Sequence, residues 1–282
     1  MDGEVIEVGM AQRLYQGRSK EAVCSVIPPI SPLLWRLFGR YARHYISRSF
    51  HAVRLSRAGC PPVASDQPLV IFLNHPSWWD PLLCLFLAQR FFPDRKHYAP
   101  IDARALARYR FFTHLGFFGV TPGTRQGART FIQTSQAILQ HRSETALWLT
   151  PEGQFADPRQ RPVRMQSGMR YLVQHLRAAI YVPLALEYPF WEERFPEVLV
   201  RFGAPIQLGP EAQHGIKSDV GLLARQLQET QDELTREACQ RQLDEFDIIL
   251  RGREGMGGIY AAWCGLRGRL WGEQFQRTHG DK

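Results

Sequence analysis

The stretch LVIFLNHPSWWD, residues 69–80, decides how the rest of the chain is interpreted. Its first five residues are all apolar, which is typical of a short strand buried on both faces of a sheet. Pro76 and Ser77 then indicate a turn, and a second apolar run begins after Asp80. A strand, a turn and a helix in this order place His75 near the carboxyl end of the strand, where open α/β sheets bind their ligands.

The same alternation continues to about residue 202. Apolar, strand-like runs predict strands at 69–74, 97–101, 117–121, 146–150, 181–186 and 198–202. Helical spacing predicts helices at 79–91, 103–114, 127–140, 166–178 and 218–243, the last with Ser218 and Asp219 as candidate caps. The fold class that follows is α/β, with a central mixed sheet flanked by helices.

The segment before this core is basic. Residues 22–65 contain no acidic side chain but six arginines: Arg36, Arg40, Arg43, Arg48, Arg54 and Arg57. A Pro-rich stop at 27–32 precedes apolar residues that recur every three or four positions from 33 to about 55, with Trp35 near the start. This pattern predicts an N-terminal amphipathic helix that associates with a membrane surface.

Composition and length limit the alternatives. The chain has 282 residues, 44% of them hydrophobic, a formal charge of +8 and a mean hydropathy of −0.29, as expected for a globular protein. Its longest apolar runs fall short of the roughly 20 residues that span a bilayer, and the first 20 residues lack a secretory signal. We therefore expect a basic helical segment at 1–65, an α/β core at 66–210, and a C-terminal helix with a Gly- and Arg-rich tail at 211–282.

Cysteine usage points away from metal and disulfide chemistry. The five cysteines are scattered, with no CxxC pair and no ligand-like spacing to histidine. We expect no metal site, no redox cofactor and a reducing compartment.

His75 and Asp80 are the first candidates for catalysis. A carboxylate five positions after a histidine, across a turn, can hold one imidazole nitrogen and leave the other free to take a proton from a bound hydroxyl. The alternative is structural, since Ser77 and Asp80 have the spacing of a helix capping box.

Three further motifs lie in or after predicted strands. Two are loops, GVTPGTR at 119–125, which ends in Arg125, and LTPEG at 149–153. The third is the strand IYVPLAL at 180–186, with Pro183 inside it. Taken singly, the first two are typical of ordinary Pro-Gly turns, and a proline within a strand indicates an edge or a bulge.

Taken together, residues from about 69 to 206 resemble the glycerolipid and lysophospholipid acyltransferase family. Its four motifs occur in order: His75-x4-Asp80, then Gly119 with Arg125, then Pro151-Glu152-Gly153, and then Val182-Pro183-Leu184. The resemblance implies an O-acyltransferase that moves a fatty acyl group from acyl-CoA or acyl carrier protein, its co-substrate, to the hydroxyl of a lysophospholipid or related lipid.

The resemblance also implies roles for single residues. His75 would be the general base and Asp80 its orienting partner. The acceptor site, typically one that holds a phosphate, would be formed by residues of the four motifs: Asn74, Gly119, Arg125, Pro151, Glu152, Gly153 and Pro183. The protein would work as a peripheral or monotopic enzyme on the cytoplasmic face of an anionic membrane.

The chain departs from the family pattern at four positions. Gln154 and Phe155 replace a small hydroxyl residue and an arginine after Glu-Gly, Thr124 replaces an acidic residue, and Gln166 replaces a lysine. These changes weaken lysophosphatidate as the acceptor and leave a lyso-aminolipid or a glycosylated isoprenoid lipid open as well.

Two other functions remain as alternatives. An acyl-thioester hydrolase would use His75 to activate water, although the chain has no GxSxG elbow. A basic nucleic-acid- or membrane-binding protein without catalysis would use the arginines, but no nucleic-acid-binding motif is visible and we expect no nucleic-acid partner.

Overall fold

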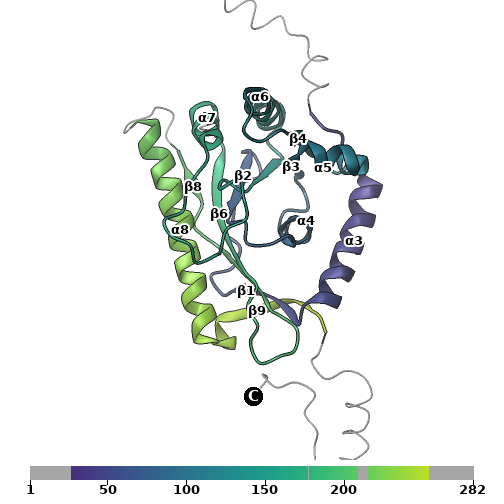
Figure 1. Cartoon of the computed structure of the whole chain (residues 1–282), viewed down its shortest axis with the longest axis vertical. Coiled ribbons are helices and arrows are strands. Elements are labelled where there is room, and N and C mark those ends of the chain that lie inside the picture. Colours follow the sequence, from purple (N-terminus) through teal and green to yellow (C-terminus); the bar gives the residue numbers. More distant parts are fainter. Residues whose placement is uncertain (1–26, 177, 209–214, 254–282) are drawn as a thin grey trace, which may run out of the picture.

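The computed structural model of the chain describes residues 27–176, 178–208 and 215–253. These residues form a nine-stranded mixed sheet with helices on both faces (Figure 1). The predicted α/β fold class is therefore confirmed. The Gly- and Arg-rich tail lies outside the described residues.

The elements alternate along the chain as follows. The N-terminal half contains α3 (Pro32–Ser49), β1 (Ala52–Ser56), β2 (Leu69–Leu73), α4 (Asp80–Phe91), β3 (Lys96–Asp102), α5 (Ala103–Arg108), the 3-10 helix η1 (Arg110–His114), β4 (Phe117–Val120), α6 (Arg125–His141) and β5 (Thr145–Leu149). The C-terminal half contains α7 (Ser167–His175), β6 (Ile180–Glu187), β7 (Val198–Phe202), β8 (Ile206–Gln207), α8 (Ile216–Gln240), the 3-10 helix η2 (Leu243–Glu245) and β9 (Phe246–Arg251).

The sheet has a parallel half and a mixed half. Its strand order is β4-β3-β5-β2-β6-β7-β1-β9, and β8 pairs with β6 beside this path. Strands β4, β3, β5, β2 and β6 run parallel, whereas β7 is antiparallel to β6 and β9 is antiparallel to β1. The carboxyl ends of the five parallel strands therefore lie along one edge of the sheet.

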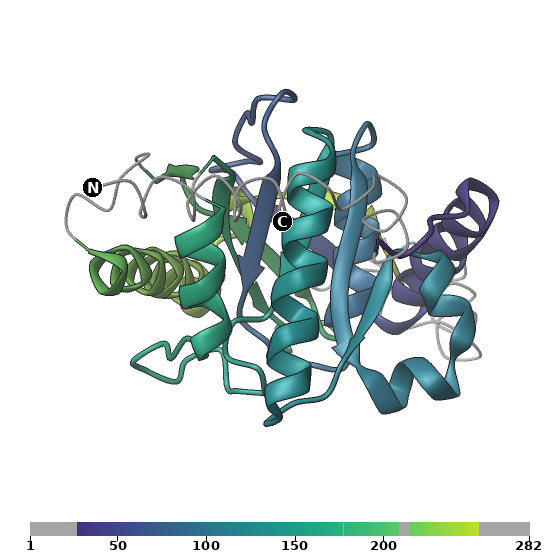
Figure 2. The same cartoon turned by 90° about the horizontal axis from the view of Figure 1, so that it is seen from above.

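Strand β2 is buried on both faces, as its continuous apolar sequence predicts. Leu69 and Ile71 belong to the core on the side of α3 and α4, and Val70 and Phe72 belong to the core on the side of α6, α7 and α8. Figure 1 shows α3 and α8 on opposite sides of the sheet, and Figure 2 shows α6 and α7 next to each other across the strands.

The predicted N-terminal helix is shorter than expected. Helix α3 starts after Ser31, whose hydroxyl accepts from the backbone N–H of Leu34, and it ends at Ser49 instead of near residue 55. Residues 52–56 form strand β1, which pairs with β7 and β9. The spacing of the apolar residues continues into this strand, and Arg54 lies where a longer helix would place a polar side chain. In fact Arg54 is buried, and its Nε donates to Glu197 Oε2 at 3.0 Å.

Two other helices differ from the prediction. The stretch 103–114 is not one helix, because Tyr109 leaves helical geometry (φ −120°, ψ 65°) and separates α5 from η1. Helix α8 starts after Gly215 (φ 84°), so neither Ser218 nor Asp219 caps it, and it ends at Gln240.

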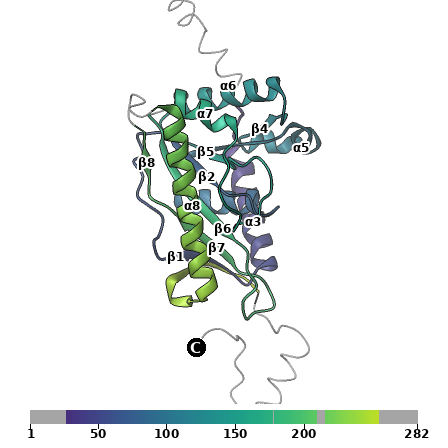
Figure 3. The same cartoon turned by 60° about the vertical axis from the view of Figure 1, so that its left-hand side comes forward.

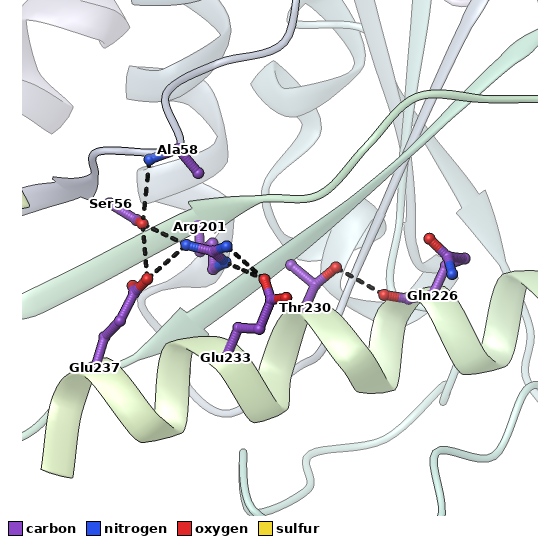
Figure 4. Close-up of polar contacts among 7 residues, drawn as sticks. All are labelled: Ser56, Ala58, Arg201, Gln226, Thr230, Glu233 and Glu237. Atoms are coloured by element: carbon purple, nitrogen blue, oxygen red, sulfur yellow. Dashed lines mark hydrogen bonds and ion pairs between the residues drawn. The ribbon is translucent and has the colours of Figure 1, made fainter. Parts of the chain in front are cut away.

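Helix α8 is held to the sheet by a cluster of polar contacts. It lies along β6 and β7 (Figure 3). Arg201 of β7 donates to Ser56 at 2.6 Å, to Glu237 at 2.5 Å and to Glu233 through Nε at 2.8 Å (Figure 4). Glu237 is buried, so its pairing with Arg201 compensates for the loss of solvation.

Within residues 27–176, 178–208 and 215–253, no helix is both long and apolar enough to span a bilayer.

Candidate active site

The candidate site lies where β2, β5 and β6 end at the common edge of the sheet. Asn74, the first residue after β2, is buried and pairs with the backbone of Leu186 in β6. Its Nδ2 donates to the carbonyl of Leu186, and the N–H of Leu186 donates to Oδ1, both at 2.9 Å. These two bonds extend the β2–β6 pairing by one step and fix the direction in which the chain leaves the sheet toward His75.

The predicted contact between His75 and Asp80 is present. His75 Nδ1 lies 2.5 Å from Asp80 Oδ2, and Asp80 is only 1% exposed at the start of α4. The backbone N–H of Ser77 donates to the same carboxylate oxygen at 3.1 Å. Asp80 thus makes the contact expected of a helix start and holds His75 at the same time.

Tyr188 is a third donor to this carboxylate. Its hydroxyl donates to Asp80 Oδ1 at 2.6 Å. Burial and the negative charge of Asp80 raise the pKa of Tyr188 well above its ordinary value, so the phenol keeps its proton. Nothing in the sequence links Tyr188 to Asp80, because the two residues are 108 positions apart.

These contacts set the proton positions on His75. Asp80 accepts from Ser77 and Tyr188, so it also accepts from His75, whose Nδ1 carries the ring proton. The Nε2 atom is then left with a lone pair. It makes no hydrogen bond to any described residue, and the His75 side chain is 19% exposed. The imidazole is therefore oriented as a base that a ligand can reach.

Phe155 packs against His75 on the outer side. The two ring centroids are 4.2 Å apart at an interplanar angle of 31°, and Phe155 is 60% exposed. The next residue, Ala156, donates its N–H to the carbonyl of His75 at 3.0 Å. The loop after β5 is thus attached directly to the catalytic candidate.

Glu152 lies on the same loop. Burial raises the pKa of its carboxyl, while the nearby backbone of His75 and the charge of Arg161 oppose this shift. Its Oε2 atom is buried and has no hydrogen-bond partner among the described residues. Pro151 is buried beside it, and Gly153 has a φ of 68°, which favours glycine and closes the turn through a bond to the carbonyl of Thr150.

Gly119 and Arg125 are farther from His75. They lie on and after β4, which is three strand positions from β2 on the same sheet edge, about 14 Å at ordinary strand spacing. Gly119 allows α5 to pack closely, because a Cβ there would lie 3.2 Å from Ala103 Cα. Arg125 is exposed at the start of α6 and makes no ion pair with another described residue.

Pro183 was predicted to lie in an edge strand or at a bulge, and the first of these alternatives is wrong. It lies in the interior strand β6, opposite Phe72 of β2. Its carbonyl accepts from Gly203 at 2.9 Å, at the gap between β7 and β8 on the other side. The missing N–H of the proline is tolerated because the neighbouring pairing is already interrupted there.

A row of aromatic side chains in mutual contact connects α3 to the site. The ring of Trp79 contacts those of Tyr45 and Phe50 at centroid distances of 5.1 and 4.9 Å, and Phe50 contacts Tyr188 at 5.7 Å. The carboxylate of Asp80 therefore lies behind an apolar surface. Within the described ranges, no group of three His, Cys, Asp or Glu side chains is arranged to hold a metal ion.

Comparison with known proteins gives one family. Residues 52–187 match the family model described as Acyltransferase, which spans β1 to β6 and contains every motif residue predicted for the site. No curated protein sequence matches the chain. The crystal structure of the 1-acyl-sn-glycerophosphate (LPA) acyltransferase PlsC from Thermotoga maritima matches with a TM-score of 0.42 and 12% identity, over 84% of this chain and 89% of that one.

Proposed function

We propose that the chain, whose residues 52–187 belong to the acyltransferase family, moves a fatty acyl group from acyl-CoA or acyl carrier protein to the hydroxyl of a lysophospholipid or a related lipid. The observation that carries the proposal is the orientation of His75. Its Nδ1 is held by a carboxylate with two further donors, and its Nε2 has no partner among the described residues.

The proposed reaction uses one general base. His75 Nε2 takes the proton of the acceptor hydroxyl while its oxygen attacks the carbonyl carbon of the thioester. Collapse of the tetrahedral intermediate breaks the carbon–sulfur bond, and the imidazolium returns the proton to the leaving thiolate. Asp80 stabilises the imidazolium throughout, and Tyr188 and Ser77 keep Asp80 in place.

The exposed surface of α3 supports work at a membrane. Four of its apolar side chains are well exposed: Leu33, Leu34, Leu37 and Tyr41. Phe38 connects them to η1 through contacts with Phe111 and Phe112 at centroid distances of 5.6 and 5.8 Å. Exposed arginines of the same helix lie beside this surface, so we propose peripheral attachment to an anionic membrane, on its cytoplasmic face.

The direct test is acyl transfer by purified protein. Full-length protein is incubated with labelled palmitoyl-CoA or palmitoyl carrier protein and a total lipid extract, and new esters are identified by mass spectrometry. We expect a His75-dependent ester, and His75→Ala is expected to lose about 10²- to 10⁴-fold in rate. Asp80→Asn is expected to lose less, because the base itself is retained.

The alternatives predict different products. A hydrolase would release free fatty acid alone even when acceptor lipids are present. A nucleic-acid-binding protein would bind duplex DNA with strong salt dependence and would not float with anionic vesicles. Either result contradicts the proposed transfer, and so does an unchanged rate for His75→Ala.

A further inference from the structure

The loop that follows β5 brings two unlike groups next to His75. Phe155 provides a flat apolar ring, and Glu152 provides a buried carboxylate oxygen without a hydrogen-bond partner among the described residues. The backbone bond from Ala156 to His75 and the turn at Gly153 fix both relative to the imidazole. Both groups therefore lie beside the imidazole that would take the proton of an acceptor.

The carboxylate of Glu152 favours a hydroxyl donor. A buried oxygen without a partner is unfavourable, and a hydroxyl group of a ligand would satisfy it. Glu152 is on the loop whose Ala156 donates to the carbonyl of His75, so its carboxyl is close to the imidazole. A phosphate dianion at the same place would be repelled by its charge.

Two of the three arginines of this loop are engaged by other groups, and the third, Arg164, is exposed. Arg159 pairs with Glu187 at 3.3 Å. Arg161 donates to Asp232 at 2.6 Å and to the carbonyls of Pro158 and Gln160. In the described part of the chain, no arginine makes a hydrogen bond or a cation–π contact with His75, and the ring of Phe155 stacks on it.

From this arrangement we propose that Phe155 and Glu152 select an acceptor lipid with an uncharged, hydroxyl-rich headgroup, namely a sugar ring, over one with a phosphomonoester. The inference rests on the proposed acyl transfer and narrows its acceptor. The apolar C–H face of the sugar packs on Phe155, as flat ligands do on aromatic side chains. One sugar hydroxyl donates to Glu152, and a neighbouring hydroxyl gives its proton to His75.

The test compares two acceptors with the same donor. Full-length protein in phosphatidylcholine vesicles receives palmitoyl-CoA and either dodecyl β-glucoside or 1-oleoyl lysophosphatidate, and kcat/KM is measured for each by mass spectrometry of the ester. We expect the glucoside to be preferred by at least about tenfold. Phe155→Leu is expected to lower kcat/KM for the glucoside by roughly three- to tenfold, because it removes the flat ring.

Two further variants sharpen the comparison. Phe155→Arg places a cation beside His75 and is expected to shift the preference toward lysophosphatidate by about tenfold or more. Tyr171→Leu is the matched control, because it removes an aromatic ring that is 46% exposed on α7, away from His75. It is expected to leave the preference unchanged.

The outcomes separate this inference from the proposed function. If the wild-type protein prefers lysophosphatidate, or if Phe155→Leu and Tyr171→Leu change the preference equally, the headgroup inference is wrong while acyl transfer stands. If no His75-dependent ester forms with either acceptor or with a total lipid extract, the proposed function itself fails.

Discussion

Replacing Tyr188 with phenylalanine tests whether the orientation of His75 depends on a third residue. The substitution removes the hydroxyl that donates to Asp80 Oδ1 at 2.6 Å and leaves the ring in place against Phe50. Asp80 is 1% exposed, so water cannot readily replace the lost donor. A hydrogen bond to a buried charged group is worth about 1.5–3 kcal/mol, which corresponds to roughly 10- to 100-fold in rate if the contact holds the base in place.

The pH dependence of the variant has a definite direction. Without the Tyr188 donor, the charge of Asp80 is less stabilised and attracts the imidazolium form of His75 more strongly. The acid limb of the kcat/KM profile is therefore expected to move to higher pH, with KM for the thioester little changed. The assay is the ester-forming reaction measured across pH 5–9.

Tyr181→Phe is the matched control. Tyr181 lies in β6, is fully buried, and donates its hydroxyl to the carbonyl of Leu176 at 3.1 Å on the opposite face of the sheet. Its loss is expected to lower stability without moving the acid limb. If Tyr188→Phe retains full activity with the wild-type pH profile, or if both variants shift the profile equally, the positioning role of Tyr188 is refuted.

Three other predictions concern stability and membrane binding. Burial lowers the pKa of His97 from 6.5 to about 4. Between these pH values only the unfolded state binds the proton, so the free energy of unfolding falls as the pH is lowered. In urea unfolding, the wild type is expected to lose about 3 kcal/mol relative to His97→Phe between pH 6.5 and 4. Arg201→Met leaves Glu237 buried without its cation and is expected to cost about 3–5 kcal/mol, most of it recovered by Arg201→Met with Glu237→Leu. Leu37→Glu is expected to reduce flotation with anionic vesicles by about tenfold or more, whereas Tyr171→Glu leaves it unchanged.

Much of the fold could be predicted because its strands are short continuous apolar runs. Strands β2 and β7 begin where the sequence predicts, and β7 also ends there. Strands β1, β8 and β9 were missed. Strand β1 contains Arg54, whose charge is compensated by Glu197, 143 residues later. A local pattern cannot show such a distant partner.

The candidate site divides in the same way. The contact between His75 and Asp80 follows from five residues of separation across one turn, and it could be predicted. The contacts of Tyr188 with Asp80 and of Glu152 with His75 depend on β6 and β5 lying next to β2. The only sequence signal for that arrangement is the order of the motifs, which gives the family but not the distances.

The geometry assigns different tasks to the two sides of His75. On the inner side, Asn74 pairs with Leu186 and Tyr188 donates to Asp80, so the orientation of the base depends on the β2–β6 pairing at the centre of the sheet. On the outer side, one backbone bond from Ala156 attaches the loop that carries Phe155. A substitution in this loop can therefore change the group presented to the acceptor without changing the base. The departure from the family pattern at Phe155 lies on this outer side.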